Sequence, residues 1–423
     1  MSQSLKNSAE LLTYGCKVNR YESELIKQEL KKAGVVFSDN PGVFIINTCT
    51  VTAKIDSEIS RKIRQLKSEG KKVIITGCLS ERKSVPEAFA AADLIIPNAS
   101  KFSVSSYRGI FESGIIPQTA QGQLILSEFS GQNKAFVKAE DGCNRFCAYC
   151  EVPYVRGSEI RSRMPDEIER EVAALSAAGY SEIILTGVNL GLYGFERNEK
   201  DALENLIKRL AKVPGLGRLR LSSIGPLETT EGLIRAAADS DGKICPHFHM
   251  SLQSGSRKIL KLMNRNYTVE QFEEKAALIR RLMPYAALTT DVIAGFPGEG
   301  ADEFKETLDF IKRTSFTRLH VFPYSDRPDA RASSFGGRVD EKEKKERVRI
   351  LIEEGRLKEE AFIKLNDGLV RQVLPENEKE EGMQAGYTDN YIRVFFEKPP
   401  EAGSLISARI TGMGGTKAAA EAV

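Results

Sequence analysis

Residues 72–78 read KVIITGC, a run of β-branched residues that predicts a buried strand ending on a cysteine. Two earlier runs end in the same way, LLTYGC at 11–16 and VFIINTC at 43–49. Charged amphipathic stretches with helical spacing separate the three runs, at 21–34 and at about 56–69. This β-α-β-α-β alternation predicts a parallel, doubly wound sheet, in which ligands bind beyond the carboxyl ends of the strands.

The cysteines that end these runs are Cys16, Cys49 and Cys78. A single cysteine at a strand end is usually a small core residue. A parallel sheet, however, brings all three strand ends to one edge, and three thiolates gathered there repel one another unless a metal neutralises them. We therefore expect a shared metal site at this edge, with three unrelated core cysteines as the alternative.

The composition of the 423-residue chain is that of an ordinary globular protein, with 41% hydrophobic and 28% charged residues, and its length suggests two or three domains. No apolar run approaches a membrane span, and the N-terminus lacks the pattern of a signal peptide. We therefore expect a cytoplasmic protein with no membrane partner. In that compartment, its seven cysteines are expected to be metal ligands or catalytic groups rather than disulfides. The net charge of +3 is too small to indicate a nucleic-acid partner.

The rest of the chain again alternates apolar runs with helical patterns, and near its C-terminal end the runs become short. Six apolar runs alternate with helical patterns from about residue 135, which predicts an incomplete parallel barrel with its chemistry on the loops after the strands. After a long charged helix the runs become short and alternating, as in a small β-barrel. The predicted fold class is α/β in four parts: a doubly wound domain at 8–112, a connection at 113–134, a partial (βα)6 barrel at 135–364 and a small β-barrel at 365–423.

The most specific motif is DGCNRFCAYC at 141–150, which places Cys143, Cys147 and Cys150 on the loop after the first barrel strand. A structural zinc site normally needs four protein ligands, and no fourth Cys or His lies nearby. Three closely spaced thiolates suit a [4Fe–4S] cluster that leaves one iron open for S-adenosylmethionine (SAM), which such a cluster cleaves reductively to a radical. A zinc or redox site is the alternative.

At this point the sequence resembles a known family. CNRFCAYC with VPYVRG, preceded by TYGCKVNRYESE, INTCTVT and TGCLSER, is similar to the radical SAM methylthiotransferases. The resemblance continues through LTGVNLGLYG, SLQSGS, DVIAGFPGE and HVFPYS and so covers nearly the whole chain. It implies that Cys16, Cys49 and Cys78 hold a second [4Fe–4S] cluster in an N-terminal methylthiotransferase domain. It also implies that 365–423 is a TRAM-like RNA-binding domain.

The resemblance implies a reaction in which a methylthio group replaces hydrogen on an unactivated carbon. SAM then serves both as methyl donor and as the radical source, with Cys143, Cys147 and Cys150 as the catalytic set. The forms GCKVNRYESE, TGVNLGLYG, LSSI and HVFPYS look most like the branch that modifies C2 of N6-threonylcarbamoyladenosine next to the anticodon of tRNA. The alternatives are isopentenyladenosine in tRNA, an aspartate of a ribosomal protein, or a noncatalytic RNA-binding metalloprotein. Expected partners are the tRNA anticodon loop and an electron donor such as flavodoxin or ferredoxin, and we expect a monomer.

Further residues take roles by their position in the motifs. The candidate SAM contacts are Tyr149, Gly187, Asn189, Ser222, Ser251, Gln253, Gly295 and Pro297; the alternative reading of the barrel motifs is a set of tight βα turns. Just past the cysteine motif, Arg156, Arg161 and Arg163 are expected to face RNA phosphates, with solvated surface arginines as the alternative.

Four positions stand apart from the family pattern. Glu151 replaces a residue that is usually apolar, Gly225 stands where the branch has Glu, and Gly300 stands where it has Thr. These departures affect individual SAM or substrate contacts and not the reaction class. Cys245, the seventh cysteine, matches no ligand motif and is expected to be structural.

Overall fold

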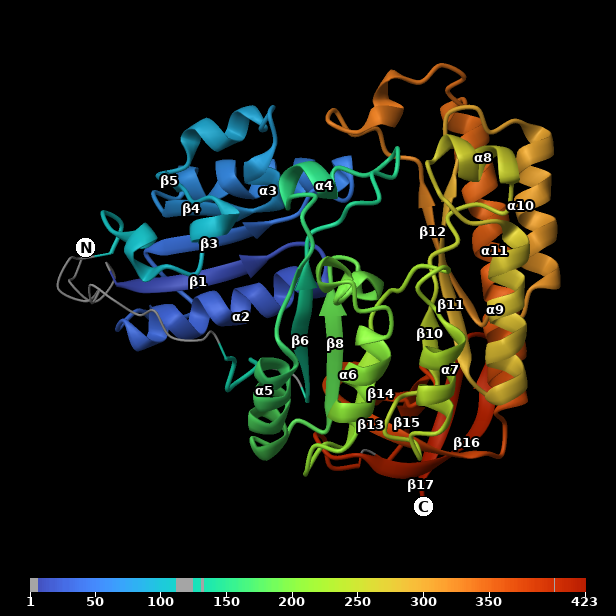
Figure 1. Cartoon of the computed structure of the whole chain (residues 1–423). Coiled ribbons are helices and arrows are strands. Elements are labelled where there is room, and N and C mark those ends of the chain that lie inside the picture. The colour runs from blue at the N-terminus through green and yellow to red at the C-terminus, as the bar shows by residue number, and fades with distance from the viewer. Residues whose placement is uncertain (1–6, 112–124, 131–132, 399) are drawn as a thin grey trace. The chain divides into compact units, whose positions relative to one another are not determined.

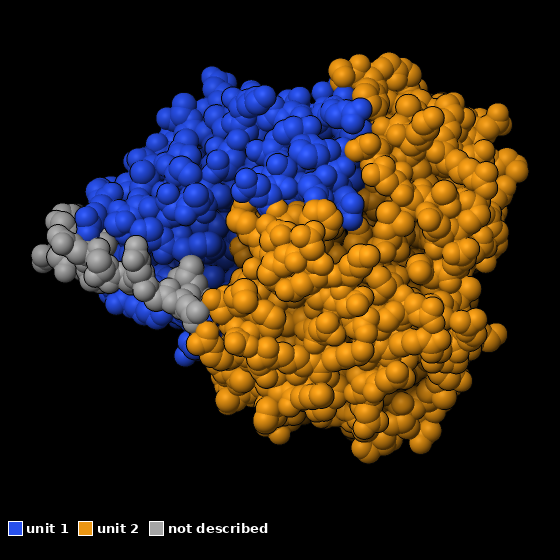
Figure 2. Space-filling view, viewed as in Figure 1, with its two compact units in different colours: residues 1–128, 142–159, 325–333 blue, residues 129–141, 160–324, 334–423 orange. Residues whose placement is uncertain are grey.

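The structure, a computed structural model, describes residues 7–111, 125–130, 133–398 and 400–423 (Figure 1). The chain divides into two compact units (Figure 2). Unit 1 comprises 1–128, 142–159 and 325–333, and unit 2 comprises 129–141, 160–324 and 334–423. The connection expected at 113–134 lies largely outside the described residues, and the division into four parts stays a prediction.

The sheet of unit 1 is the parallel sheet that the cysteine-ended runs predict (Figure 1). Its strands follow the order β2-β1-β3-β4-β5, a doubly wound arrangement. Their bounds are β1 (Ser8–Thr13), β2 (Val36–Phe37), β3 (Val43–Thr48), β4 (Lys72–Gly77) and β5 (Leu94–Ile95). Strands β1, β3 and β4 are neighbours in register, so that Ile45 pairs with Leu11 on one side and with Ile74 on the other. All six residues of β3 are buried, which makes it the centre of the unit.

Two long helices connect these strands, α2 (Lys17–Lys32) and α3 (Ala53–Ser68). Helix α2 ends where Gly34 adopts a φ of +88°, a conformation that glycine accepts without strain. The Thr52 side chain caps α3 by accepting from the Ile55 N–H. Beyond β4 the chain forms short 3₁₀ turns: η1 (Cys78–Glu81), η2 (Glu87–Ala91), η3 (Asn98–Ser100) and η4 (Val104–Tyr107). The segment 142–159 adds the short helix α4 (Val152–Val155).

Unit 2 contains the six strands expected for the partial barrel (Figure 1). They are β6 (Lys134–Asp141), β8 (Glu182–Gly187), β9 (Arg218–Leu221), β10 (His247–His249), β11 (Ala287–Ala294) and β12 (Arg318–Pro323). The strands β6, β8 and β9 pair in parallel, as do β10, β11 and β12, and single parallel bridges such as Ile224 with Met250 join the two groups. The two-residue strand β7 (Arg161–Ser162) pairs antiparallel with β6.

The helices between these strands carry the apolar stripes that the sequence predicts. They are α5 (Pro165–Ala177), α6 (Ala202–Leu210), α7 (Glu231–Ala238), α8 (Arg257–Leu262), α9 (Val269–Leu282) and α10 (Ala301–Arg313), with short 3₁₀ turns η5 (Leu190–Leu192) and η6 (Phe195–Arg197). The 3₁₀ turn η7 (Arg331–Ser334) follows β12. The long charged helix is α11 (Glu341–Leu365). Among the described helices, none is long and apolar enough to cross a membrane.

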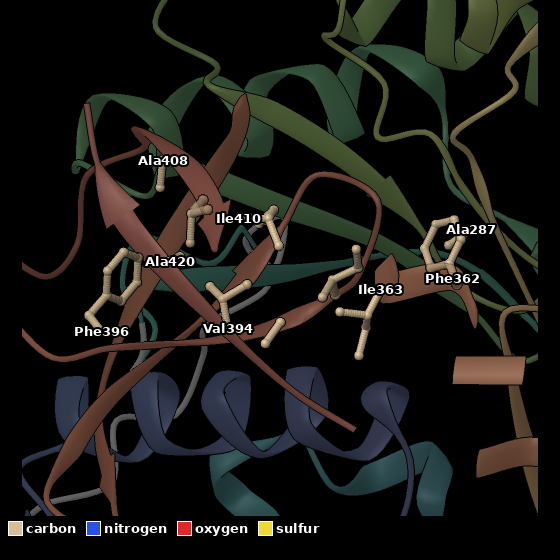
Figure 3. Close-up of a cluster of buried hydrophobic side chains, with 11 residues drawn as sticks. Ala287, Phe362, Ile363, Val394, Phe396, Ala408, Ile410 and Ala420 are labelled. Atoms are coloured by element: carbon tan, nitrogen blue, oxygen red, sulfur yellow. The ribbon is translucent and has the colours of Figure 1, made fainter. Parts of the chain in front are cut away.

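The C-terminal strands close into a small barrel in the order β13-β14-β15-β17-β16. They are β13 (Val370–Glu380), β14 (Met383–Thr388), β15 (Arg393–Phe396), β16 (Ile406–Gly414) and β17 (Lys417–Ala422). The apolar core of this barrel continues into the rest of unit 2, since Ala287 of β11 and Phe362 and Ile363 of α11 belong to the same buried cluster (Figure 3). The C-terminal barrel is thus packed on the larger barrel and not attached only by its chain.

A buried ion cluster at the base of the larger barrel strengthens this attachment. Glu182, Arg218 and Arg220 are at most 3% exposed, and both guanidinium groups donate to the carboxylate. Arg218 also donates to the main-chain oxygens of residues 372 and 387, and Arg220 to those of 388 and 389. Four carbonyl oxygens of the C-terminal barrel are therefore satisfied by two arginines of β9.

Candidate metal centres

The three strand-end cysteines of unit 1 lie where the topology predicts them. Cys16 is the N-cap of α2 in the loop after β1, Cys49 directly follows β3, and Cys78 directly follows β4. Because β1, β3 and β4 are adjacent and parallel, the three thiols gather at one edge of the sheet. They also interact: burial, together with the neighbouring Cys78 and Cys16, raises the pKa of Cys49 to about 12.

Close packing of the three loops makes this gathering possible. Gly15 has a φ of +100°, and a Cβ atom there would stand 2.4 Å from the Cys49 Sγ. Only glycine therefore lets the first loop approach the second thiol. The Asn19 side-chain amide donates to the Tyr14 and Thr48 carbonyl oxygens, at 2.8 Å each, and so ties the first loop to the second. Sequence reasoning missed Asn19; its position three residues after Cys16, at the start of a helix, was the available signal.

No three His, Cys, Asp or Glu side chains among the described residues converge as the ligands of a single metal ion do. A four-iron cluster requires a different arrangement of ligands. Each of its cysteines binds a separate iron, so the sulfurs need not converge on one point. Three thiols at one sheet edge, one exposed and two buried, fit that donor set.

The second cysteine set lies on one loop, within the segment 142–159 of unit 1. The Cys143 N–H donates to the Gly157 carbonyl oxygen at 3.2 Å, which closes the loop, and the Cys150 N–H donates to the Cys147 oxygen at 3.0 Å. All three thiols are partly exposed. Burial of its sulfur raises the pKa of Cys150, and Cys147 and Cys143 raise it further, so these thiols are also close enough to interact. Tyr149 is half-buried on the same loop.

Glu151 directly follows the last cysteine of this loop, at a position where the family usually has an apolar residue. Its surroundings explain why a carboxylate stands there. The carboxylate is 2% exposed and accepts from the Arg82 Nη2 at 2.8 Å and from the Arg327 Nε at 3.3 Å. The Thr50 hydroxyl, next to Cys49, donates to it as well. Both arginines also donate to Asp56. Burial acts to raise the pKa of Glu151, but the hydrogen bonds from Arg82 and Thr50 and the charge of Arg327 hold it below its usual value.

Arg156 is buried, whereas a residue that faces RNA should be exposed. It is 8% exposed, its Nε–H donates to the Cys78 Sγ at 3.0 Å, and its two terminal nitrogens donate to Glu22 at 2.8 Å each. A guanidinium engaged in this way has few N–H groups left for phosphate. Arg161 is exposed in β7, whereas Arg163 is half-buried and pairs with Glu171. The phosphate-contact prediction is therefore carried best by Arg161.

In unit 2, the predicted SAM contacts all follow the carboxyl ends of barrel strands. Gly187 is the last residue of β8 and Asn189 follows it, Ser222 follows β9, Ser251 and Gln253 follow β10, and Gly295 and Pro297 follow β11. Gln253 and Gly295 have positive φ values, +68° and +75°, as the tight βα turns of the alternative reading also require. The Ser222 hydroxyl is buried and has no hydrogen-bond partner among the described residues. It is thus available to a ligand.

Glu140, at the end of β6, is a candidate that sequence reasoning missed. Its Oε2 accepts from the Asn189 N–H at 2.8 Å, while its Oε1 is buried without a partner in the described part of the chain. Burial raises the pKa of Glu140 to about 8. A Cβ atom at Gly187 would stand 2.6 Å from Oε2, so the glycine of TGVN makes room for this carboxylate. An acidic residue at the carboxyl end of a barrel strand was the available signal.

Comparison with known proteins finds two matching family models and several similar enzymes. The family model described as the Radical SAM superfamily matches residues 139–311, and the model described as uncharacterized protein family UPF0004 matches residues 8–97. The threonylcarbamoyladenosine tRNA methylthiotransferase MtaB of Thermotoga maritima is 34% identical over 90% of this chain and 89% of its own length. The enzyme of the same name from Bacillus subtilis is 35% identical over 95% of this chain and 93% of its own.

A relative with another printed substrate is similar to nearly the same degree. The tRNA-2-methylthio-N(6)-dimethylallyladenosine synthase of Pelotomaculum thermopropionicum is 32% identical over 95% of this chain and 94% of its own length. Among solved structures, the radical SAM methyltransferase TsrM from Kitasatospora setae matches with a TM-score of 0.53, covering 77% of each chain at 15% identity. This last likeness is one of fold alone.

Proposed function

Because the chain belongs to the radical SAM methylthiotransferase family, we propose that it attaches a methylthio group to C2 of N6-threonylcarbamoyladenosine next to the anticodon of tRNA. The observation that carries the proposal is the gathering of Cys16, Cys49 and Cys78 at one sheet edge, in addition to the separate motif of Cys143, Cys147 and Cys150. The choice of substrate rests on the names of the relatives with 34% and 35% identity. Isopentenyladenosine is the second candidate, since the relative named for dimethylallyladenosine is 32% identical.

Membership in the radical SAM superfamily implies SAM and a [4Fe–4S] cluster. We assign that cluster to Cys143, Cys147 and Cys150, and a second cluster to Cys16, Cys49 and Cys78. Bound clusters supply the one-electron chemistry that a C–H bond without an acidic proton requires. The chain itself supplies ligands and orientation: the short main-chain hydrogen bonds of the 142–159 loop hold its three thiols on a tight turn.

For SAM, the strand ends of unit 2 offer complementary groups. The buried, unpartnered Oε1 of Glu140 suits a cationic group such as the α-ammonium of SAM, and the cation would keep the carboxyl ionised. The unpartnered hydroxyl of Ser222 suits a ribose or carboxylate oxygen. The other predicted contacts, Tyr149 among them, are proposed on position only. An electron donor such as flavodoxin or ferredoxin, and a monomeric state, likewise stay predictions.

The substrate is tested by nucleoside mass spectrometry of tRNA from a strain that lacks this protein. We expect 2-methylthio-N6-threonylcarbamoyladenosine to disappear and 2-methylthio-isopentenyladenosine to persist. Re-expression of the wild-type chain should restore the lost nucleoside, and a variant with alanine at Cys143, Cys147 and Cys150 should not. The opposite nucleoside pattern, or a change confined to the mass of a ribosomal protein, contradicts the assignment.

Arg161→Glu is expected to weaken binding of all tRNA substrates alike and to lower the slope of log affinity against log salt by about one. The reason is that an exposed arginine facing a phosphate releases one condensed counterion on binding. Filter binding or fluorescence anisotropy over a salt series measures the slope. The same reversal at Arg281, exposed on the outer helix α9, is the control. If both variants keep the wild-type slope, Arg161 does not face phosphate.

A further inference from the structure

A buried cation next to a candidate cluster ligand is the strongest unexplained feature of unit 1. Arg156 is the C-cap of α4, and its main-chain N–H donates to the Val152 oxygen at 2.9 Å. This short helix directs the side chain inward, where its Nε–H reaches the Cys78 sulfur at 3.0 Å. Sulfur has a larger van der Waals radius than oxygen, so an N···S distance of 3.0 Å is a short contact.

Several hydrogen bonds hold the Arg156 guanidinium in place. Its Nη1 and Nη2 form a fork with the two oxygens of Glu22, and its Nη2 also donates to the Asn19 Oδ1 at 2.6 Å. Lys101, only 1% exposed, donates to the same carboxylate at 2.6 Å. Two cations thus share one anion, and the group carries a net charge of +1 beside the Cys78 thiol. Such a bidentate geometry fixes Arg156 in position.

The charge of this group matches what a metal-bound thiolate needs. Arg156 donates to the Cys78 Sγ at 3.0 Å, and Lys101 shares the Glu22 carboxylate with Arg156. A cluster ligand is a thiolate, so a donor and a positive charge placed at its sulfur favour the ligating form.

We propose, on the basis of the function proposed above, that Arg156 is a positioning residue of the cluster at Cys16, Cys49 and Cys78. Its N–H···S hydrogen bond fixes the Cys78 sulfur, and its charge raises the reduction potential of that cluster. Reduction adds negative charge to a cluster, and a hydrogen bond or a cation at a ligand sulfur stabilises the reduced form more than the oxidised one.

The position of Arg156 in the chain gives this role a second consequence. Arg156 belongs to the loop of Cys143, Cys147 and Cys150, and the Cys143 N–H binds the oxygen of the next residue, Gly157, at 3.2 Å. The loop that carries one thiol set therefore also supplies the hydrogen-bond donor to the other set. Replacement of Arg156 acts on the second set without removing any thiol.

The experiment is an EPR-monitored redox titration of the anaerobically reconstituted full-length protein. The variants are Arg156→Gln, which removes the charge, and Arg156→Lys, which keeps a charge but loses the planar fork. Arg108→Gln, at an exposed arginine of the same unit, is the matched control. A variant with alanine at Cys16, Cys49 and Cys78 provides the signal of the other cluster alone, which is subtracted.

We expect the midpoint potential of the second cluster to fall in Arg156→Gln, to fall less in Arg156→Lys and to stay at the wild-type value in Arg108→Gln. If Arg156→Gln loses that cluster, retention of the cluster at a lowered potential in Arg156→Lys supports the proposal as well. Equal potentials in wild type and both Arg156 variants overturn it, as does loss of both clusters in both variants. A wild-type protein that never binds a second cluster contradicts the proposed function instead, which keeps the two failures distinct.

Discussion

A variant in which Cys16, Cys49 and Cys78 are all alanine is expected to keep about half of the wild-type iron, the share of one of two four-iron clusters. It should still cleave SAM to 5′-deoxyadenosine under reducing conditions and should insert no sulfur into tRNA. The physical reason is the separation of the two thiol sets in the chain. One set comes from three strand ends of a sheet, and the other lies within one loop that is closed by its own main-chain hydrogen bonds.

Iron and sulfide analysis with a SAM-cleavage assay measures both expectations. Cys245→Ala is the matched control, because this cysteine is 1% exposed in unit 2 and belongs to neither set. It should keep the full iron content and the full activity. Alanine at Cys143, Cys147 and Cys150 should give the complementary result, with about half of the iron and no reductive cleavage. Full iron content in the first variant would show that the strand-end thiols are core residues.

The second large effect concerns stability. Glu182→Gln is expected to destabilise the protein by about 3–5 kcal/mol, the usual cost of breaking a buried pair by removing one partner. Arg218 and Arg220 would then keep two buried positive charges without their shared anion. The contact also holds the C-terminal barrel, so the loss should loosen it from the rest of unit 2.

The urea midpoint of the protein measures this effect, with Glu346→Gln on the exposed face of α11 as the control that should leave it nearly unchanged. The pH dependence supplies an independent reading. The two arginines outweigh the effect of burial and hold the pKa of Glu182 well below its usual value. A carboxyl with a depressed pKa stabilises the fold above its unfolded pKa of about 4.3 and loses that contribution as the pH falls further. Wild type should therefore lose stability below that pH, and Glu182→Gln should lose less.

The sequence alone predicts the features of the fold that follow from periodicity and from the rules of sheet topology. The alternation of apolar runs predicts the parallel sheet, and the sheet then places Cys16, Cys49 and Cys78 at one edge although no local motif connects them. The six barrel strands, the long helix α11 and the C-terminal barrel follow from period and turn residues in the same way. Each of these inferences depends on spacing along one segment or on a topological rule that holds for all such sheets.

Features that depend on a side-chain contact between distant segments were not predictable. The position of Arg156 just past the cysteine motif predicts a phosphate contact, yet its partners Glu22 and Cys78 lie 134 and 78 residues away. Glu151 departs from the family pattern, and its partners Arg82 and Arg327 lie 69 and 176 residues away in the chain. The period of the C-terminal strands predicts a barrel but cannot show that Arg218 and Arg220 will reach its carbonyl oxygens.

Unit 1 is built from three separate stretches of the chain. Its parts must therefore fold in a certain order while the chain is synthesised. The N-terminal sheet can form early, but Glu151 must be buried with Arg327, which the ribosome adds 176 residues later. The Ala332 N–H likewise completes the thiol loop only then, by donating to the Ala148 oxygen at 2.7 Å. Contacts of such long sequence separation form slowly, because a large loop must close first. Most of the polypeptide must therefore be made before the loop around Cys143 and Cys150 reaches its final conformation, and metal loading there should be a late, largely post-translational step.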